Sequence, residues 1–141
     1  MPDNMIHAVY PVTAGDYTRA GEASSDIKRR LKQLGVDSAV LRRVSVASYE
    51  VEINLVIHSL GGELTLDVLP DRVRLSSRDV GPGIPDIEMA MRAGYSTANE
   101  EARNLGFGAG MGLPNMRRNA DMFNIDSAPG RGTTIDMDFF F

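Results

Sequence analysis

The sequence contains no cysteine, and this absence removes several classes of site at once. A disulfide framework, a zinc site built on thiolates and a cysteine nucleophile are all excluded. No apolar run approaches the ~20 residues that a membrane-spanning helix needs, and the first residues lack the basic and then apolar profile of a signal peptide. We therefore expect a reduced, cytoplasmic protein in which residues 1–141 form a single domain.

An excess of basic charge is also missing. The 15 Lys and Arg residues are scattered along the chain and are outnumbered by 19 Asp and Glu residues, which gives a net charge of −4. This pattern provides no electrostatic footprint for nucleic acid. An acidic chain can still bind a nucleotide, because backbone amides and a metal ion can supply a local positive field around phosphates.

The first part of the chain is predicted to contain a strand followed by a helix. Residues Ile6–Val12 have the pattern of a strand, and Pro11 indicates an edge position because proline cannot donate a ladder hydrogen bond. Asp16 is predicted to cap a helix whose apolar residues recur at three- and four-residue steps as far as Leu34. Gly35 would end this helix.

The segment from Asp37 to Leu60 supports two interpretations. It has a helical stripe that includes Val40 and Val44, but residues 51–57 also alternate as a strand would. We predict a helix, because 24 residues without Gly or Pro greatly exceed the usual strand of about five or six residues. Asp37 would cap this helix.

The second half of the chain is predicted to be richer in strands. Glu63–Leu69 and Val73–Asp79 alternate and are joined by a Pro-Asp-Arg turn, which predicts a hairpin. Regular βαβ alternation is missing, so we predict a two-layer α/β sandwich (α+β) with a mixed, mostly antiparallel sheet covered on one face by helices. The remaining predicted elements are a short helix from Ile84 to near Gly94, a mobile loop over Tyr95–Gly110, a helix over Pro114–Asp121, and strands over Met122–Ser127 and Thr133–Phe141.

Asp79 is the first candidate site residue. Its strand phase places it on the same face as Val73 and Leu75, toward the helix-covered side of the sheet. A buried carboxylate needs a donor, and an adenine amino group or a nearby backbone turn would each supply one. The phase does not choose between these two donors. Gly81 and Gly83 flank a proline in a tight turn that would bring backbone close to whatever Asp79 binds.

Glu50 and Asn54 form a second candidate pair, one turn apart on the predicted long helix. A carboxylate and a carboxamide so placed could act as a general base and as an oxygen ligand for Mg²⁺. Taken alone, this spacing is more often found on the solvated flank of a helix.

The segment GFGAGMGLP, residues 106–114, places four glycines directly ahead of a predicted helix. It is either a slack linker or a loop that presents bare backbone amides to a phosphate. The Walker A pattern and the dinucleotide fingerprint are both missing. Met111, Leu113 and Met116 disfavour a linker, since linkers rarely carry such apolar anchors. A generic anion site at the helix N-terminus is what remains.

These motifs occur in one order along the chain. Over Val40–Phe141 the chain resembles the Bergerat-fold (GHKL) ATP-binding domain shared by gyrase, histidine kinases and mismatch-repair ATPases. Within that family, the local sequences of residues 79–97, 110–118 and 127–135 are most similar to the bacterial partner-switching serine/threonine kinases, of the anti-sigma factor and stressosome switch-kinase type. The matching motifs are E-x-x-x-N (Glu50, Asn54), D-x-G-x-G (Asp79, Gly81, Gly83), G-x-G-x-G (Gly108, Gly110, Gly112) and the pair Gly132-Thr133.

The resemblance implies a role for each of these residues. Glu50 would be the catalytic residue that accepts or orients the proton of a substrate serine. Asn54 would hold Mg²⁺ against the phosphates of ATP, and Asp79 would bind the adenine amino group. The other ATP-binding residues would be Gly81, Gly83, Gly108, Gly110, Met111, Gly112 and Thr133.

The resemblance also implies a serine/threonine kinase, dependent on ATP and Mg²⁺, that phosphorylates a STAS-domain protein. The alternatives are a nucleotide-gated module that sequesters a sigma factor or another regulator without phosphate transfer, and an ATPase without a protein substrate. Sigma-binding members often carry an arginine where this chain has Gly108. This difference favours a STAS-domain substrate and leaves Arg103 or Arg117 to stabilise the transferring phosphoryl group. A homodimer is compatible with the resemblance, whereas neither nucleic acid nor a membrane is expected as a partner.

Overall fold

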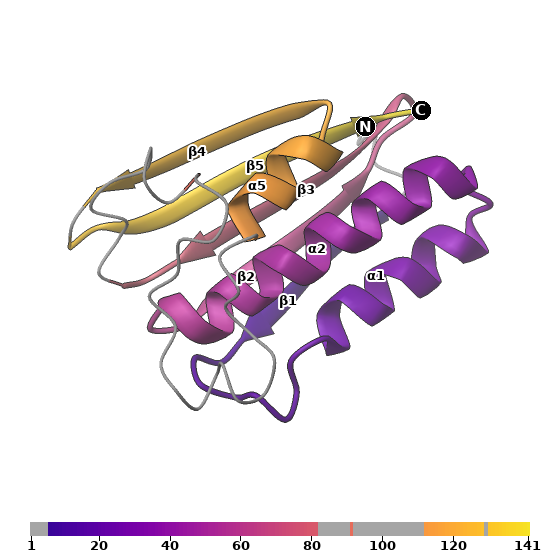
Figure 1. The fold of residues 1–141 in the computed structure, drawn as a ribbon. Helices are drawn as coiled ribbons and strands as arrows, with labels where there is room; N and C mark the ends of the chain where they lie inside the picture. Colours follow the sequence, from indigo (N-terminus) through magenta and orange to yellow (C-terminus); the bar gives the residue numbers. More distant parts are fainter. Residues whose placement is uncertain (1–5, 82–90, 92–111, 129) are drawn as a thin grey trace.

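A computed structural model of the chain describes residues 6–81, 91, 112–128 and 130–141. In this part of the chain the strands form one sheet, and the helices cover one of its faces (Figure 1). The predicted two-layer α+β architecture is therefore confirmed. The helix expected from Ile84 and the loop expected over Tyr95–Gly110 lie outside the described residues. The elements are β1 (Ile6–Val12), α1 (Glu22–Gln33), α2 (Ser38–His58), β2 (Gly62–Val68), β3 (Arg72–Asp79), α5 (Gly112–Asn119), β4 (Met122–Ala128) and β5 (Gly132–Phe140).

The strands follow the order β1-β2-β3-β5-β4, and every described pairing is antiparallel. The sheet, predicted to be mixed, is thus antiparallel throughout the described residues. β1 lies at one edge, as Pro11 indicated. The predicted hairpin is β2 and β3, in which Val68 pairs with Val73.

The core lies between the sheet and the helices. Leu66, Leu75 and Met137 form one row across β2, β3 and β5, and each is almost completely buried. Val44 and Val51 of α2 belong to the same cluster. Because full burial of one such side chain contributes about 1.5–3 kcal/mol, this row holds α2 firmly on the sheet.

α2 confirms the helical interpretation of the long ambiguous segment. Asp37 caps the helix by accepting a hydrogen bond from the backbone N–H of Ala39 at 3.1 Å, and the chain leaves the helix at Ser59 in an extended conformation. Packing of the apolar stripe outweighs the low helix propensity of its β-branched residues. Although α2 has 21 residues, neither it nor another helix in the described part of the chain is long and apolar enough to cross a membrane.

The first helix starts later than its predicted cap, Asp16. The preceding residues 13–21 make turns, and the Gly15 N–H donates to the carbonyl of Val56 at 2.8 Å. The Asp16 carboxylate accepts instead from the Thr18 hydroxyl at 2.9 Å. The bond from Gly15 to Val56 of α2 holds the turn segment outside the helix. The start of α1 was therefore predicted wrongly, whereas its end near Gly35 agrees with the prediction.

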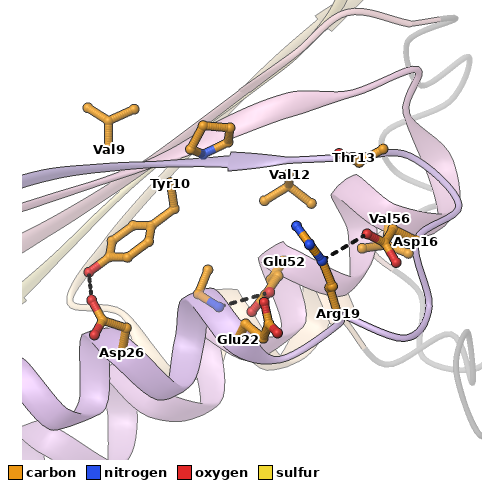
Figure 2. Close-up of a pocket in the computed structure, with 12 residues that line it drawn as sticks. Val9, Tyr10, Val12, Thr13, Asp16, Arg19, Glu22, Asp26, Glu52 and Val56 are labelled. Atoms are coloured by element: carbon orange, nitrogen blue, oxygen red, sulfur yellow. Dashed lines mark hydrogen bonds and ion pairs between the residues drawn. The ribbon is translucent and has the colours of Figure 1, made fainter.

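Glu52 of α2 supplies the cap that α1 lacks. Its buried carboxylate accepts hydrogen bonds from the backbone N–H groups of Gly21, Ala23 and Ser24 at 3.0, 3.1 and 2.9 Å. Figure 2 shows the Glu52 side chain at the start of α1, with one of these bonds drawn as a dashed line. N–H groups in a first helical turn have no partner inside the helix, and a negative charge suits the positive end of the helix dipole. The start of α1 is therefore set by a neighbouring helix.

The boundaries of α5 also differ slightly from the prediction. The helix begins at Gly112, two residues before Pro114, and stops before Asp121. The backbone N–H of Asp121 donates to the carbonyl of Asp138 at 2.9 Å, and the Asp121 carboxylate accepts from the N–H of Phe140 at 2.7 Å. These two bonds attach Asp121 to the sheet, so the chain has to leave the helix before it.

Replacing Glu52 with alanine should lower the free energy of unfolding by about 3 kcal/mol, because three N–H groups at the start of α1 lose their acceptor. Urea denaturation followed by circular dichroism measures this change. Glu52→Gln keeps one side-chain oxygen and should lose less. The control is Glu22→Ala, which removes an exposed acid from the same helical turn and should cost less than about 1 kcal/mol. Equal losses in the two alanine variants would contradict the capping role.

Candidate functional site

The first cluster of predicted site residues lies where β3 ends beside β5. Asp79 is the last residue of β3 and shares a face with the buried residues Leu75 and Ser77. Its Oδ1 accepts a hydrogen bond from the backbone N–H of Thr133 at 2.9 Å. The predicted inward phase of Asp79 agrees with this position, and the backbone donor belongs to the neighbouring strand.

The Asp79 carboxyl is partly removed from water. Burial raises the pKa of Asp79, and the hydrogen bond from Thr133 acts in the opposite direction. In the described part of the chain, only Thr133 donates a hydrogen bond to this carboxylate. A partly desolvated carboxylate whose second oxygen receives no hydrogen bond from the described residues is suited to bind an N–H group of a ligand, such as the exocyclic amine of a purine.

Close backbone packing holds this cluster together. Gly132 has a φ of 92°, and a Cβ at this position would overlap the carbonyl oxygen of Asp79. At Gly81, a Cβ would lie 3.3 Å from the backbone nitrogen of Leu60. Gly132 therefore allows an approach that a larger residue would prevent, whereas a side chain at Gly81 would require its neighbours to shift slightly.

The second cluster forms where α5 begins against α2. Glu50 and Asn54 lie half-buried on one side of α2, and a Cβ added to Gly112 would lie 3.3 Å from both Glu50 Oε2 and Asn54 Oδ1. The last glycine of the G-x-G-x-G motif thus meets the E-x-x-x-N pair directly. Without a side chain at Gly112, the first N–H groups of α5 can approach an anion beside these two side chains.

α2 links the two clusters and sets their separation. Ser59, at the end of α2, has its Cα 3.4 Å from a Cβ built on Gly81, next to Asp79. Asn54 and Glu50 precede Ser59 by five and nine residues, which is roughly 8 and 14 Å along the helix axis at ~1.5 Å per residue. A ligand that touches both clusters has to be elongated, with a hydrogen-bonding end near Asp79 and an anionic end near α5.

Two residues that the sequence analysis did not single out join these clusters. Asn115 Nδ2 donates to Glu50 Oε1 at 3.4 Å, and Ser127 Oγ lies 2.8 Å from Thr133 Oγ1. The position of Asn115, nearly one helical turn after Gly112, is a signal that could have indicated it. Ser127 could have been found from the strand register, because it pairs with Thr133.

The structure brings six of the predicted site residues into these two clusters. The other predicted site residues lie outside the described residues, and their assignment stays a prediction. The residues placed are Glu50, Asn54, Asp79, Gly81, Gly112 and Thr133. Those outside are Gly83, Gly108, Gly110 and Met111, together with the candidate Arg103.

A separate cavity of about 220 Å³ lies between β1, α1 and α2 (Figure 2). The Tyr10 hydroxyl donates to Asp26 at 2.6 Å, and burial together with this bond raises the pKa of Tyr10 to about 12. Arg19 pairs with Asp16 at 3.8 Å, and Glu52 is occupied by the amides of α1. These side chains bind one another and the adjoining helix, and the cavity belongs to neither cluster.

Comparison with known proteins identifies relatives over most of the chain. Residues 40–141 match the profile of the family described as Histidine kinase-, DNA gyrase B-, and HSP90-like ATPase. Serine/threonine-protein kinase RsbT of Bacillus subtilis (strain 168) is 32% identical over 108 residues, which cover 74% of this chain and 75% of that protein. Anti-sigma F factor of Bacillus licheniformis is 34% identical over 113 residues, covering 76% and 74%. Anti-sigma F factor of Caldanaerobacter subterraneus subsp. tengcongensis is 30% identical over 99 residues, covering 67% and 66%.

Gly132→Ala should destabilise the fold by about 1–3 kcal/mol and weaken ATP binding at least tenfold. The new Cβ combines an unfavourable φ with an overlap at Asp79, so the strand ends that carry Asp79 and Thr133 are forced apart. Gly130→Ala is the matched control, because its φ is 78° but nothing lies within 4 Å of its Cβ. It should cost stability alone and leave the affinity for Mg–ATP, measured by calorimetric titration, unchanged. Equal affinities in the two variants would refute the role of this contact.

Asp79→Asn should be at least as stable as the wild type at neutral pH while losing at least tenfold in ATP affinity. Because burial raises the folded-state pKa of Asp79 above its ordinary value of 3.8, the ionised carboxylate destabilises the fold at neutral pH. This cost disappears as the pH falls through the folded-state pKa toward 3.8 and the carboxyl takes up its proton. Thermal unfolding of both proteins across this range should show the advantage of the variant shrinking with acidity. A variant less stable than the wild type at neutral pH would contradict this assignment.

Proposed function

Since the chain belongs to the family of histidine kinase-, DNA gyrase B- and HSP90-like ATPases, we propose that it is a partner-switching serine/threonine kinase whose substrate is a STAS-domain protein. The kinase class is supported by the relation to Serine/threonine-protein kinase RsbT over three-quarters of both chains. The assignment of a STAS-domain protein as the substrate is more specific, and it rests on the sequence likeness to switch kinases.

The observation that carries this proposal is the meeting of Gly112 with Glu50 and Asn54. It joins the start of α5, where backbone N–H groups attract phosphate, to a carboxylate able to accept a proton. ATP, when bound, supplies the phosphoryl group that is transferred. The Glu50 carboxylate accepts or orients the proton of the substrate serine, and Asp79 with Thr133 binds the adenine end. Phosphoryl transfer depends mainly on such positioning and on charge stabilisation.

Mg²⁺ is part of the proposal, and the donor set beside α5 fits it. The described residues contain no group of three His, Cys, Asp or Glu that could form an all-protein metal cage. Mg²⁺ bound with a nucleotide usually takes only one or two protein oxygens, because phosphates and waters supply the others. Asn54 Oδ1 is such an oxygen at the place where phosphate would be held, so we assign the metal to Asn54.

The whole chain, residues 1–141, is proposed to form one ATPase domain acting in the cytoplasm, where ATP is available. Residues before the matched region support this view, because β1 pairs along β2 and α1 is capped by Glu52 of α2. Gly83, Gly108, Gly110 and Met111 are proposed to complete the nucleotide site.

A binding module that sequesters a sigma factor without phosphate transfer is the second candidate. Its support is that several relatives are anti-sigma F factors, at 30–34% identity. A homodimer would be compatible with either activity.

Incubation with labelled ATP, Mg²⁺ and purified STAS-domain proteins should transfer phosphate to a serine or threonine of one of them. Glu50→Gln should lower the transfer rate by about 100-fold or more, since it removes the proton acceptor, while Mg–ATP still binds. Glu63→Gln, a change of an exposed glutamate on β2, is the control and should transfer at the wild-type rate.

Other outcomes separate the candidate functions. Retained transfer in Glu50→Gln would remove Glu50 as the base. A stable nucleotide-dependent complex with a sigma factor, without phosphate transfer, would select the binding module. Turnover of ATP that no protein accelerates would select a partner-free ATPase.

A further inference from the structure

Asn115 occupies a position that the four sequence motifs do not cover. It lies on α5, three residues after Gly112, and its Nδ2 donates to Glu50 Oε1 at 3.4 Å. The other carboxylate oxygen, Oε2, is the one that faces Gly112. Both carboxylate oxygens of Glu50 therefore lie against α5.

The amide of Asn115 is itself oriented. Arg118 Nη1 donates to Asn115 Oδ1 at 3.3 Å, so the carbonyl end points toward Arg118 and the NH₂ end is left for Glu50. In addition, Asn119 Nδ2 donates to the backbone carbonyl of Asn115 at 2.8 Å. The contact with Arg118 sets which end of the amide meets the carboxylate, and the Asn119 bond attaches to the backbone of the same residue.

The far end of α5 is also fastened to α2. Arg43 Nη1 donates to the backbone carbonyl of Asn119 at 3.2 Å and to the carboxylate of Asp121 at 2.9 Å. Met116, between these two attachments, is completely buried in the core. α5 is thus held along α2 at its start, its middle and its end.

We propose that Asn115 is a positioning residue that holds the Glu50 carboxylate in the orientation needed to accept the substrate proton. This inference rests on the proposed kinase function. The donor sits on the same helix whose start would receive the phosphates. The helix that binds the phosphates therefore also aligns the base, and no direct contact between Asn115 and substrate is required.

The test compares Asn115→Ala, Asn115→Asp and the control Asn124→Ala, an exposed asparagine on β4. Phosphate transfer to the STAS-domain protein that accepts phosphate from the wild type should show kcat lowered about 5- to 20-fold in Asn115→Ala. The KM for ATP should change less than about twofold, because positioning acts on the chemical step. Asn115→Asp, which keeps the size but places a carboxylate against Glu50, should lose more. Asn124→Ala should match the wild type.

A double-mutant cycle separates positioning from a general structural effect. In the Glu50→Gln background, Asn115→Ala should change kcat by less than about twofold, because the residue acts through Glu50. Equal losses in the two backgrounds, or an unchanged kcat in Asn115→Ala, would overturn the inference. If the wild type transfers no phosphate to any STAS-domain protein, the proposed function fails. If the wild type and Glu50→Gln transfer phosphate at the same rate, the kinase function stands and the inference about Asn115 and Glu50 fails, so the two failures are distinguishable.

A readout without catalysis completes the test. Crystal structures of nucleotide-free wild type and Asn115→Ala should show Glu50 in one conformer in the wild type and displaced or in several conformers in the variant. An identical Glu50 conformer in both crystals would overturn the inference whatever the rates are. Thermal unfolding of all variants should stay close to the wild type, because Asn115 lies at the surface of the α2–α5 contact and is only partly buried.

Discussion

The packing of α2 on the sheet is the constraint on which the remaining geometry depends. Val44, Val51 and Leu55 are buried on one stripe of this helix, and their contact with the sheet fixes the rotation of α2 about its axis. With the rotation fixed, Glu52 faces the start of α1 and Glu50 faces the start of α5. A rotation by a single residue, about 100°, would break the cap of α1 and separate Glu50 from Gly112 together.

The two ends of the proposed nucleotide site are built on different physical grounds. Near Asp79, the proposed function uses a partly buried carboxylate, and burial raises the pKa of this group. Near Gly112 the requirement is an absent side chain, which lets backbone N–H groups stand beside Glu50 and Asn54. In the proposed site, the end at Asp79 would recognise a base through a directed hydrogen-bond acceptor. The end at Gly112 would attract negative charge of any kind. Such a division suits a nucleotide, with its patterned base and its uniform phosphates.

Membership of this ATPase family places the chain among proteins whose chemistry is largely a matter of positioning. The described residues show how α5 is attached beside the proposed site. α5 is short, yet it is attached to α2 through Arg43 at one end and through Asn115 near the other. α5 and α2, which are remote in sequence, thus meet at the Glu50 carboxylate. α5 contributes both to the proposed anion site and to the surroundings of the candidate base.

Local sequence determined the elements and the order of the motifs. The period of apolar residues and the cap Asp37 predicted α2, alternation predicted the β2–β3 hairpin, and the four motifs predicted the family that the comparisons confirm. Tertiary structure alone decided the cap of α1 by Glu52, over a separation of 31 residues at Gly21, and the bond from Asn115 to Glu50, over 65 residues. The physical reason is that periodicity and caps report the surroundings of a residue along its own element. A hydrogen bond between distant segments exists only after packing has fixed how two helices face each other.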